Sequence, residues 1–269
     1  MCRFKSGIIL KSKVVVASGE NDSHSDLLDS LGIEDNYIGA SKVFVRAELV
    51  PKDNQWWIDP AKEPENWTFV VDQDIVPDWF DREEHEKIFR ETVCGWWKEH
   101  VLVDQKLDEL SNGYYRLKRC EVKKLLNDVK VLLDSSQIGT MLGSSQIGTM
   151  LGSSRVDTML GSSRVDTMLG SSRVDTMLGS SRVGEMWGSS QIGTMWGSSR
   201  VGTMWGSSQV GEMWDNSQID TMRDSSQIGK MWGKSTARDF KYYPKIKIWV
   251  SPEGTFEMVT HKNKEEEHE

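Results

Sequence analysis

The stretch GSSRVDTMLGSSRVDTMLGSSRVDTML, residues 152–178, contains one nine-residue unit three times without a change. The unit recurs with small variations over residues 134–232, in eleven copies, and a degraded twelfth copy, GKSTARDFK, follows. Self-similarity at a short fixed period is typical of repeat proteins whose units stack on their neighbours. The sequence therefore predicts a solenoid over residues 134–232.

The columns of the repeat predict its core. When the unit is numbered from its Gly, position five is always Ile or Val, position eight is always Met, and position three is always Ser. Ile, Val and Met are among the residues most often buried, so positions five and eight should face inward. Position three lies on the same strand face as position five, where a small side chain fits near a corner.

Two further columns predict turns. Positions one and six hold only Gly or Asp in all eleven units, and these residue types tolerate turns and left-handed backbone angles. We expect two turns per unit, so that two units, about 18 residues, close one four-sided coil. With strands about 4.8 Å apart, the eleven units predict a β-solenoid of five to six coils, about 25 to 30 Å long.

Positions four and seven vary between Gln and Arg and among Thr, Glu and Lys, so they should face solvent. In three units an Arg at position four precedes an Asp at position six. These pairs predict exposed salt bridges worth at most ~1 kcal/mol each: Arg155 with Asp157, Arg164 with Asp166, and Arg173 with Asp175.

Position nine provides the candidate functional site. It is Leu in the first five units and then becomes Trp, with one Arg interposed. A column that admits Arg should be at least partly exposed, and an 18-residue coil separates it into two opposite sides. We interpret it as a surface for a partner or for self-association, with corner packing and stacking of sugars or bases as alternatives. The residues are Trp187, Trp205 and Arg223 on one side, and Trp196, Trp214 and Trp232 on the other.

The flanking sequence predicts an α+β head domain over residues 1–110, with strands in SGIILKSKVVVA, KVFVRAELV and WTFVVDQ. One helix is expected in HSDLLDSLG, capped by Ser25 or Asp26 and stopped at Gly32, and another begins after Asp81. Phe89, Val93, Trp96 or Trp97, and Val101 should form the buried stripe of the second helix. We further expect a linker and solenoid cap over 111–133, a C-terminal cap hairpin over 233–260, and a charged tail over 261–269.

Composition limits the possible functions. A net charge of −8 and a pI near 5.3 favour solubility and argue against direct nucleic-acid binding. We expect no signal peptide or membrane span, because no apolar run is long enough. The three cysteines, Cys2, Cys94 and Cys120, suit neither a disulfide framework nor a zinc site, so a cytoplasmic location is expected.

Residues with catalytic or metal-binding chemistry are scattered. His85 lies in EEHE, which an acidic first helical turn explains, and His24 with Asp26 is interpreted as a helix start. Cys94 and His100 fall about 120° apart around a helix and should not meet. We therefore expect no enzyme activity, no cofactor and no metal. A calcium β-roll is disfavoured because position six is Gly in seven of eleven units, and an ice-binding surface because the Thr columns are interrupted.

The unit GSSQIGTMWG, through Ser145, Ile147, Gly148, Met150 and their copies, resembles the short Gly-x-Ala/Ser-x-Val repeats of uncharacterised bacteriophage and prophage proteins. Such repeats often follow a small N-terminal α+β domain, and VDQDIVPDWF adds to the resemblance. The resemblance implies a β-solenoid and a phage setting but no agreed activity. With seven basic and nine acidic residues, the array lacks the acidity of a DNA mimic.

These observations predict a non-enzymatic protein that presents the position-nine column to a macromolecular partner in the cytoplasm of a bacterial host. The expected partner is a protein, such as a nuclease or nucleoprotein complex of a CRISPR-type or other defence system that this chain would inhibit. A homodimer through the Trp column is also expected, with no membrane association. The alternative is a structural spacer or assembly element of a virion.

Overall fold

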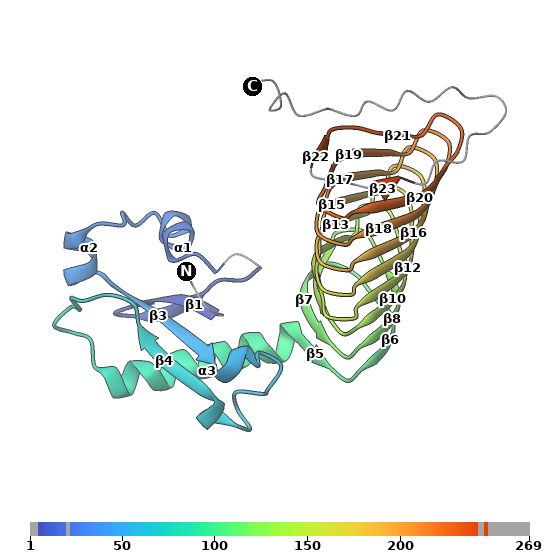
Figure 1. The fold of residues 1–269 in the computed structure, drawn as a ribbon. Helices are drawn as coiled ribbons and strands as arrows, with labels where there is room; N and C mark the ends of the chain where they lie inside the picture. The colour runs from blue at the N-terminus through green and yellow to red at the C-terminus, as the bar shows by residue number, and fades with distance from the viewer. Residues whose placement is uncertain (1–4, 20–21, 242–244, 247–269) are drawn as a thin grey trace, which may run out of the picture. The chain divides into compact units, whose positions relative to one another are not determined.

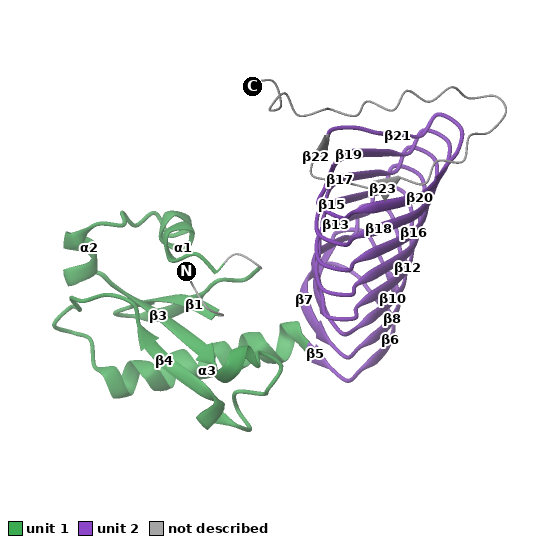
Figure 2. Cartoon of the chain, in the orientation of Figure 1, with its two compact units in different colours: residues 1–101 green, residues 102–269 purple. Residues whose placement is uncertain are grey.

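The computed structural model describes residues 5–19, 22–241 and 245–246. The chain forms two compact units, residues 1–101 and 102–269 (Figure 2). Among the described residues, no helix combines the length and the apolar character needed to cross a membrane.

The first unit is built on a four-stranded antiparallel sheet in the order β2-β1-β3-β4 (Figure 1). The strands are β1 (Lys5–Leu10), β2 (Lys13–Val16), β3 (Phe44–Pro51) and β4 (Trp67–Val71). Short 3-10 turns at Lys52–Asn54 and Pro64–Asn66 lie between β3 and β4. The strands predicted from alternating apolar residues are therefore confirmed.

Three helices complete this unit. α1 (His24–Ser30) begins one residue after Ser23, whose side chain accepts a hydrogen bond from the Asp26 N–H, so the predicted cap at Ser25 or Asp26 was wrong by two or three residues. α2 (Tyr37–Lys42) was not predicted. α3 (Arg82–His100) is capped by Asp81 as predicted, and its Phe89, Val93 and Trp96 are buried.

The second unit is a parallel β-solenoid of about eight turns, with about 18 residues per turn divided between two sheets. From β5 to β21, odd-numbered strands form one sheet and even-numbered strands the other, because successive repeats alternate between the sheets. The strands of the regular array are β10 (Gln137–Met141), β11 (Gln146–Leu151), β12 (Arg155–Met159), β13 (Arg164–Met168), β14 (Arg173–Met177), β15 (Arg182–Met186), β16 (Gln191–Met195), β17 (Arg200–Met204), β18 (Gln209–Met213), β19 (Gln218–Arg223) and β20 (Gln227–Met231).

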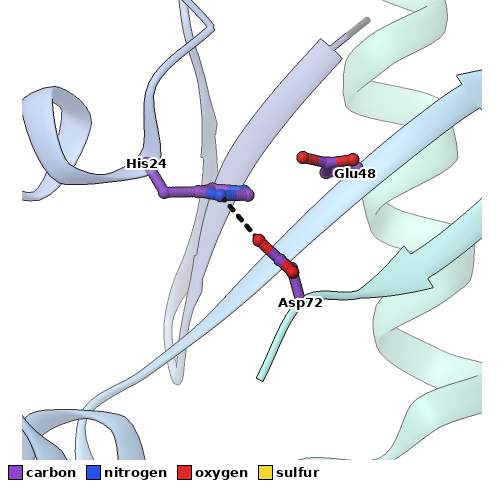
Figure 3. A group of neighbouring side chains, drawn as sticks. All are labelled: His24, Glu48 and Asp72. Carbon is purple, nitrogen blue, oxygen red and sulfur yellow. Dashed lines mark ion pairs between the residues drawn. The ribbon is translucent and has the colours of Figure 1, made fainter. Parts of the chain in front are cut away.

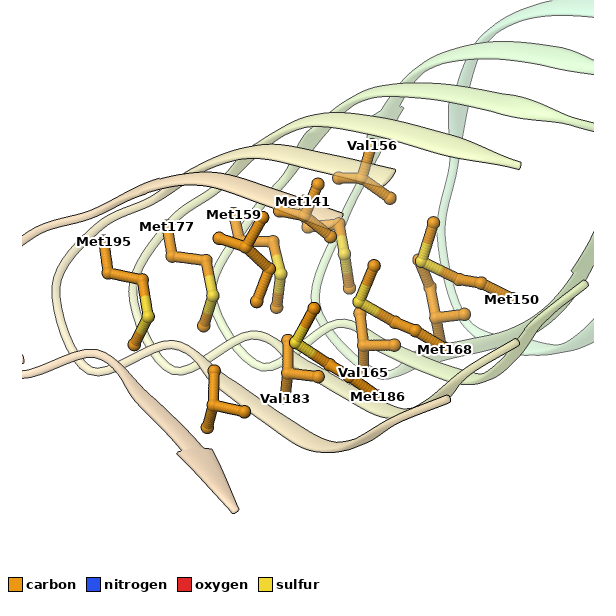
Figure 4. Packing of buried hydrophobic residues seen from close by; sticks show 14 of the residues in the cluster. Met141, Met150, Val156, Met159, Val165, Met168, Met177, Val183, Met186 and Met195 are labelled. Carbon is orange, nitrogen blue, oxygen red and sulfur yellow. The ribbon is translucent and has the colours of Figure 1, made fainter. Parts of the chain in front are cut away.

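The predicted core columns are confirmed. Every Ile or Val at position five and every Met at position eight is at most 4% exposed, and the position-three Ser side chains are equally buried. In the ladders, each core residue lies beside its equivalent in the next turn, as Val156 beside Val174 and Met159 beside Met177. Figure 4 shows the Met and Val side chains in rows along the interior. Stacking therefore buries a core that a single unit could not enclose.

The chain turns once per repeat, at position one. Glycines there have φ between 59° and 71°, and Asp215 and Asp224 share this left-handed conformation. The position-three N–H closes the turn on the position-nine carbonyl, as from Ser154 to Leu151 at 3.2 Å. The N–H of Ser162 also donates to Gly143 O of the preceding coil at 2.9 Å, so the hydrogen-bond ladder continues through the turns.

The second turn expected at position six was wrong, because these residues lie inside the strands with ordinary φ. The strand bends there instead. In the ladders, the residues at positions five and seven pair with their equivalents, but those at position six do not. The side chains at positions five and eight are both buried. In a straight strand, residues three apart point to opposite faces, so the strand must bend between them. The backbones lie close together here, since a Cβ on Gly193 would lie 2.5 Å from Asp175 O, but Asp at position six in four units shows that a Cβ can be accommodated.

The solenoid begins well before the regular repeat. β5 (Val101–Val103), β6 (Lys106–Leu110), β7 (Gly113–Lys118), β8 (Glu121–Leu125) and β9 (Val129–Asp134) already belong to its two sheets. The predicted head boundary at residue 110 and the linker at 111–133 were therefore wrong. The period was hidden because these coils are shorter: Glu121 pairs with Gln137, 16 residues on, whereas Arg155 pairs with Arg173, 18 residues on.

The degraded twelfth unit continues the ladder at the C-terminal end. β21 (Thr236–Ala237) and β22 (Phe240–Lys241) pair in parallel with β19, and β23 (Lys245–Ile246) pairs in parallel with β20. The pairing of β23 lies beyond Pro244 in the chain. The rest of the predicted cap hairpin and the charged tail lie outside the described residues.

Candidate functional site

The position-nine side chains form two columns, as the 18-residue coil predicts. The first column, on the turns that follow the odd-numbered strands, stacks Trp187 on Trp205 with ring centroids 4.7 Å apart and 7° between the planes. Arg223 continues it, with its guanidinium 4.3 Å from the Trp205 ring centroid. The second column stacks Trp196, Trp214 and Trp232 at 4.8 and 5.0 Å. We call them the Trp187 column and the Trp196 column.

Stacking determines which parts of the indoles can meet a partner. The ring spacing matches the strand spacing of about 4.8 Å, so the ring faces look along the solenoid axis toward the next coil. Trp205 is covered on its two faces by Trp187 and Arg223, and Trp214 by Trp196 and Trp232. The columns therefore present ring edges to solvent, which disfavours stacking of sugars or bases on them.

The first tryptophan of each column is the most exposed. Trp187 and Trp196, at the N-terminal ends of the stacks, are each 37% exposed, whereas the other three tryptophans are half-buried. The half-buried leucines at position nine precede them in the same columns: Leu142, Leu151, Leu160, Leu169 and Leu178. The Trp196 column is therefore a continuous apolar strip along the regular array, and the Trp187 column is continuous up to Arg223.

The polar groups of the strips are only partly satisfied within the described chain. The indole N–H of Trp187 donates to Glu185 at 2.8 Å, and that of Trp214 donates to Glu212 at 3.1 Å. The Nε1 atoms of Trp205 and Trp232 are buried without a hydrogen-bond partner in the described chain. Contact at the strips would therefore be mainly apolar.

The outward positions four and six carry the predicted ion pairs. Arg155 lies 3.0 Å from Asp157 and also contacts Asp175 of the next coil, which raises the pKa of the Arg155 guanidinium. Arg164 pairs with Asp166, and Arg173 with Asp175. This charged group lies N-terminal to the tryptophans along the array.

The catalytic candidates considered in the sequence analysis, His85, Cys94, Cys120 and His100, have structural roles or lack activation. The His85 Nδ1 lies 2.7 Å from Asp81 O, and its ring packs against Trp79 and Phe80. Burial raises the pKa of the Cys94 thiol, which disfavours the reactive thiolate, and Cys94 and Cys120 are both free. The His100 ring packs on Trp96. None of these environments indicates a catalytic group.

The structure brings together three residues that the sequence did not connect. His24 at the start of α1, Glu48 in β3 and Asp72 just after β4 have potential metal-ligand atoms within 4.8 Å of one another (Figure 3). His24 Nε2 lies 3.0 Å from Ala47 O, and His24 Nδ1 lies 3.4 Å from Asp72 Oδ2. His24 and Glu48 are buried, whereas Asp72 is 59% exposed. The 24-residue spacings between them leave no local motif.

Exposed apolar side chains are concentrated around α2. Tyr37 and Ile38 of α2 are 71% and 66% exposed, and Ile75 and Val76 are 39% exposed. Gln73 connects the two segments by donating hydrogen bonds to Ala40 O and Ile75 O. This second apolar surface was also missed, because α2 is too short to show a helical period.

The fold defines the chain as a parallel β-solenoid protein with an N-terminal antiparallel α+β unit. Comparison of the chain with protein-family models, curated proteins and solved structures finds no match. These comparisons therefore identify no family for the chain.

Proposed function

We propose that the protein is a non-enzymatic binding protein whose solenoid presents the Trp187 and Trp196 columns to a protein partner. The main support for this proposal is that these columns are continuous, since partly exposed apolar side chains repeat at every turn along two edges of the array. Large contiguous apolar surfaces with polar rims are typical of protein interfaces, in which Trp and Arg are enriched.

The scaffold supports this proposal because it holds the columns in fixed positions. Hydrogen bonds connect each coil to the next through the strands and the turns, as between Trp205 N and Met186 O at 2.8 Å. Stacked indoles have few alternative rotamers, so little side-chain entropy remains to be lost on binding. A preorganised, edge-presenting apolar strip suits another protein surface better than a sugar or a base.

The test is capture of partners from a bacterial host by the full chain and by a Trp187→Ala/Trp196→Ala double variant. These two indoles are the most exposed of the columns, so their removal should leave the fold intact while losing the partner. The matched control is Gln191→Ala/Arg200→Ala, which removes exposed position-four side chains from the same coils. A partner retained by the Trp variant would place the binding surface elsewhere.

The expected identity of the partner, a nuclease or nucleoprotein complex of a bacterial defence system, rests on the resemblance of the repeat to phage and prophage proteins. Inhibition of such a nuclease by the full chain, lost in the Trp variant, would support it. Capture only of proteins unrelated to nucleic-acid cleavage would contradict it.

A second copy of the chain is another expected occupant of the columns. Lateral association would bury the strips in a two-fold dimer, whereas pairing at the open ends of the solenoid would give fibres. Light scattering of the full chain and of a Trp205→Ser/Trp214→Ser/Trp232→Ser variant distinguishes these states. A monomeric parent, or a variant that still dimerises, removes self-association as the reason for the tryptophans.

The uninterrupted ladder favours one alternative, a spacer or assembly element of a virion, since the number of coils sets the length of a solenoid. Detection of the chain in purified particles would support this function, and its absence from them would exclude it.

A further inference from the structure

We propose that His24, Glu48 and Asp72 of the first unit bind a divalent first-row transition-metal ion, of which Zn²⁺ is the first to test. This site is independent of the Trp columns. The three side chains come from α1, β3 and the end of β4, and Figure 3 shows the His24 ring directed toward the two carboxylates.

The separation of the ligand atoms fits a shared ion. Two ligands bonded to Zn²⁺ at about 2.1 Å with tetrahedral angles lie about 3.4 Å apart. His24 Nδ1 and Asp72 Oδ2 are 3.4 Å apart, and all three groups offer atoms within 4.8 Å. A modest change in the Glu48 side-chain torsions would close the remaining gap.

The protonation of His24 follows from its backbone contact. A carbonyl oxygen only accepts hydrogen bonds, so the Nε2 atom that lies 3.0 Å from Ala47 O carries a proton. If the ring is neutral, the Nδ1 lone pair is directed toward Asp72. A histidine held through one nitrogen by a backbone carbonyl while the other binds metal is the usual arrangement in metalloproteins. A proton on Nδ1, giving a His24–Asp72 ion pair, is the rival explanation.

Glu48 supports the site through its burial. It is 7% exposed, and the described part of the chain shows no hydrogen bond or ion pair to its side chain, although its carboxylate oxygens are not among the fully enclosed atoms without a partner. Ser6, its partner across the β1–β3 ladder, is fully buried, and its hydroxyl likewise has no hydrogen-bond partner. A largely buried carboxylate is stabilised by a nearby positive charge, and a cation between Glu48 and His24 would supply that charge.

The donor set indicates the class of ion. One imidazole and two carboxylates suit Zn²⁺, Mn²⁺ or Fe²⁺, whereas Ca²⁺ and Mg²⁺ prefer oxygen ligands alone. The exposure of Asp72 leaves a path for the ion to enter and room for water as a further ligand.

Calorimetric titration of the untagged full chain with ZnCl₂ tests the site. All samples carry Cys2→Ser, His261→Ala and His268→Ala, so that the N-terminal thiol and the HKNKEEEHE tail cannot bind the ion. We expect one Zn²⁺ per chain, no comparable binding of Ca²⁺, and a melting temperature that rises with added Zn²⁺.

The variants Asp72→Asn and Glu48→Gln should each weaken Zn²⁺ binding about tenfold or more and reduce the rise in melting temperature. Asp74→Asn, which removes an exposed carboxylate two residues from Asp72, is the matched control and should bind like its parent. Absence of binding in the parent would overturn the proposal and leave the His24–Asp72 ion pair. Binding unchanged by Asp72→Asn, a surface substitution that should not affect folding, would overturn it equally.

Discussion

The two units of this chain bury different kinds of side chain. In the regular array, the buried polar side chains are the position-three serines, and each core residue packs beside its own equivalent 18 residues away. The first unit buries charged groups: Lys5 is fully buried, lies 2.7 Å from Asp22 and lies 3.8 Å from the Trp96 ring centroid. Repetition makes the environment of a residue predictable, whereas specific polar contacts depend on the assembled fold.

The largest expected effect is an unpaired charge in the solenoid core. Ile192→Asp or Val201→Asp should lower the free energy of unfolding by ~3 kcal/mol or more, because the carboxylate would lie between coils without a partner. Gln191→Asp and Thr203→Asp, at outward positions, should cost less than ~0.5 kcal/mol. Urea denaturation of the four variants measures the difference. Equal losses at the two sets would refute the assignment of inward and outward columns.

The buried pair in the first unit should be the next most sensitive feature. Lys5→Met removes the cation and leaves the Asp22 carboxylate only partly hydrated, because that side chain is 11% exposed. We therefore expect the free energy of unfolding to fall by about 2 kcal/mol. Lys5→Met/Asp22→Asn should recover part of that loss. Urea denaturation measures both changes. A double variant no more stable than Lys5→Met would show that packing against Trp96 matters more than charge.

Glycines should respond in opposite directions in the two units. Gly197 has φ 68°, and a Cβ there would lie 3.1 Å from Gly179 O, so Gly197→Ala should cost about 1 to 2 kcal/mol. Gly95 lies within α3 with nothing near its would-be Cβ, so Gly95→Ala should stabilise by up to about 1 kcal/mol. Thermal melting gives both signs. A stabilised Gly197→Ala variant would contradict the assigned left-handed turn.

The smallest effect is expected at the surface ion pairs. Arg155→Gln removes contacts with Asp157 and Asp175, but the Arg155 side chain is 47% exposed, so the loss should stay below about 1 kcal/mol. The difference in the free energy of unfolding between Arg155→Gln and its parent should shrink as NaCl is raised from 0.05 to 1 M. At 1 M the Debye length is only about 3 Å, so exposed charges are screened. A loss that persists in high salt would indicate a packing role for the Arg155 stem.

The sequence predicted the regular solenoid well because every unit repeats the same local environment. Position five, position eight and the Ser column could be assigned by comparing eleven copies, and the i to i+18 pairing of the tryptophans followed from the coil length. The coils over residues 101–133 were missed because shorter turns disrupt the period. Their corners also use Asp104, Asn112, Arg119 and Asp128 in left-handed conformations in place of glycine.

The repeat, its core columns and the two edges that carry the tryptophans could be predicted from the sequence, since these features depend on local period and residue type. Tertiary structure alone decided that position six bends without a turn, that indole faces are covered by stacking, and that His24, Glu48 and Asp72 meet. Such features depend on contacts between residues far apart in the chain. No local pattern encodes them until the strands have paired and the helices have packed.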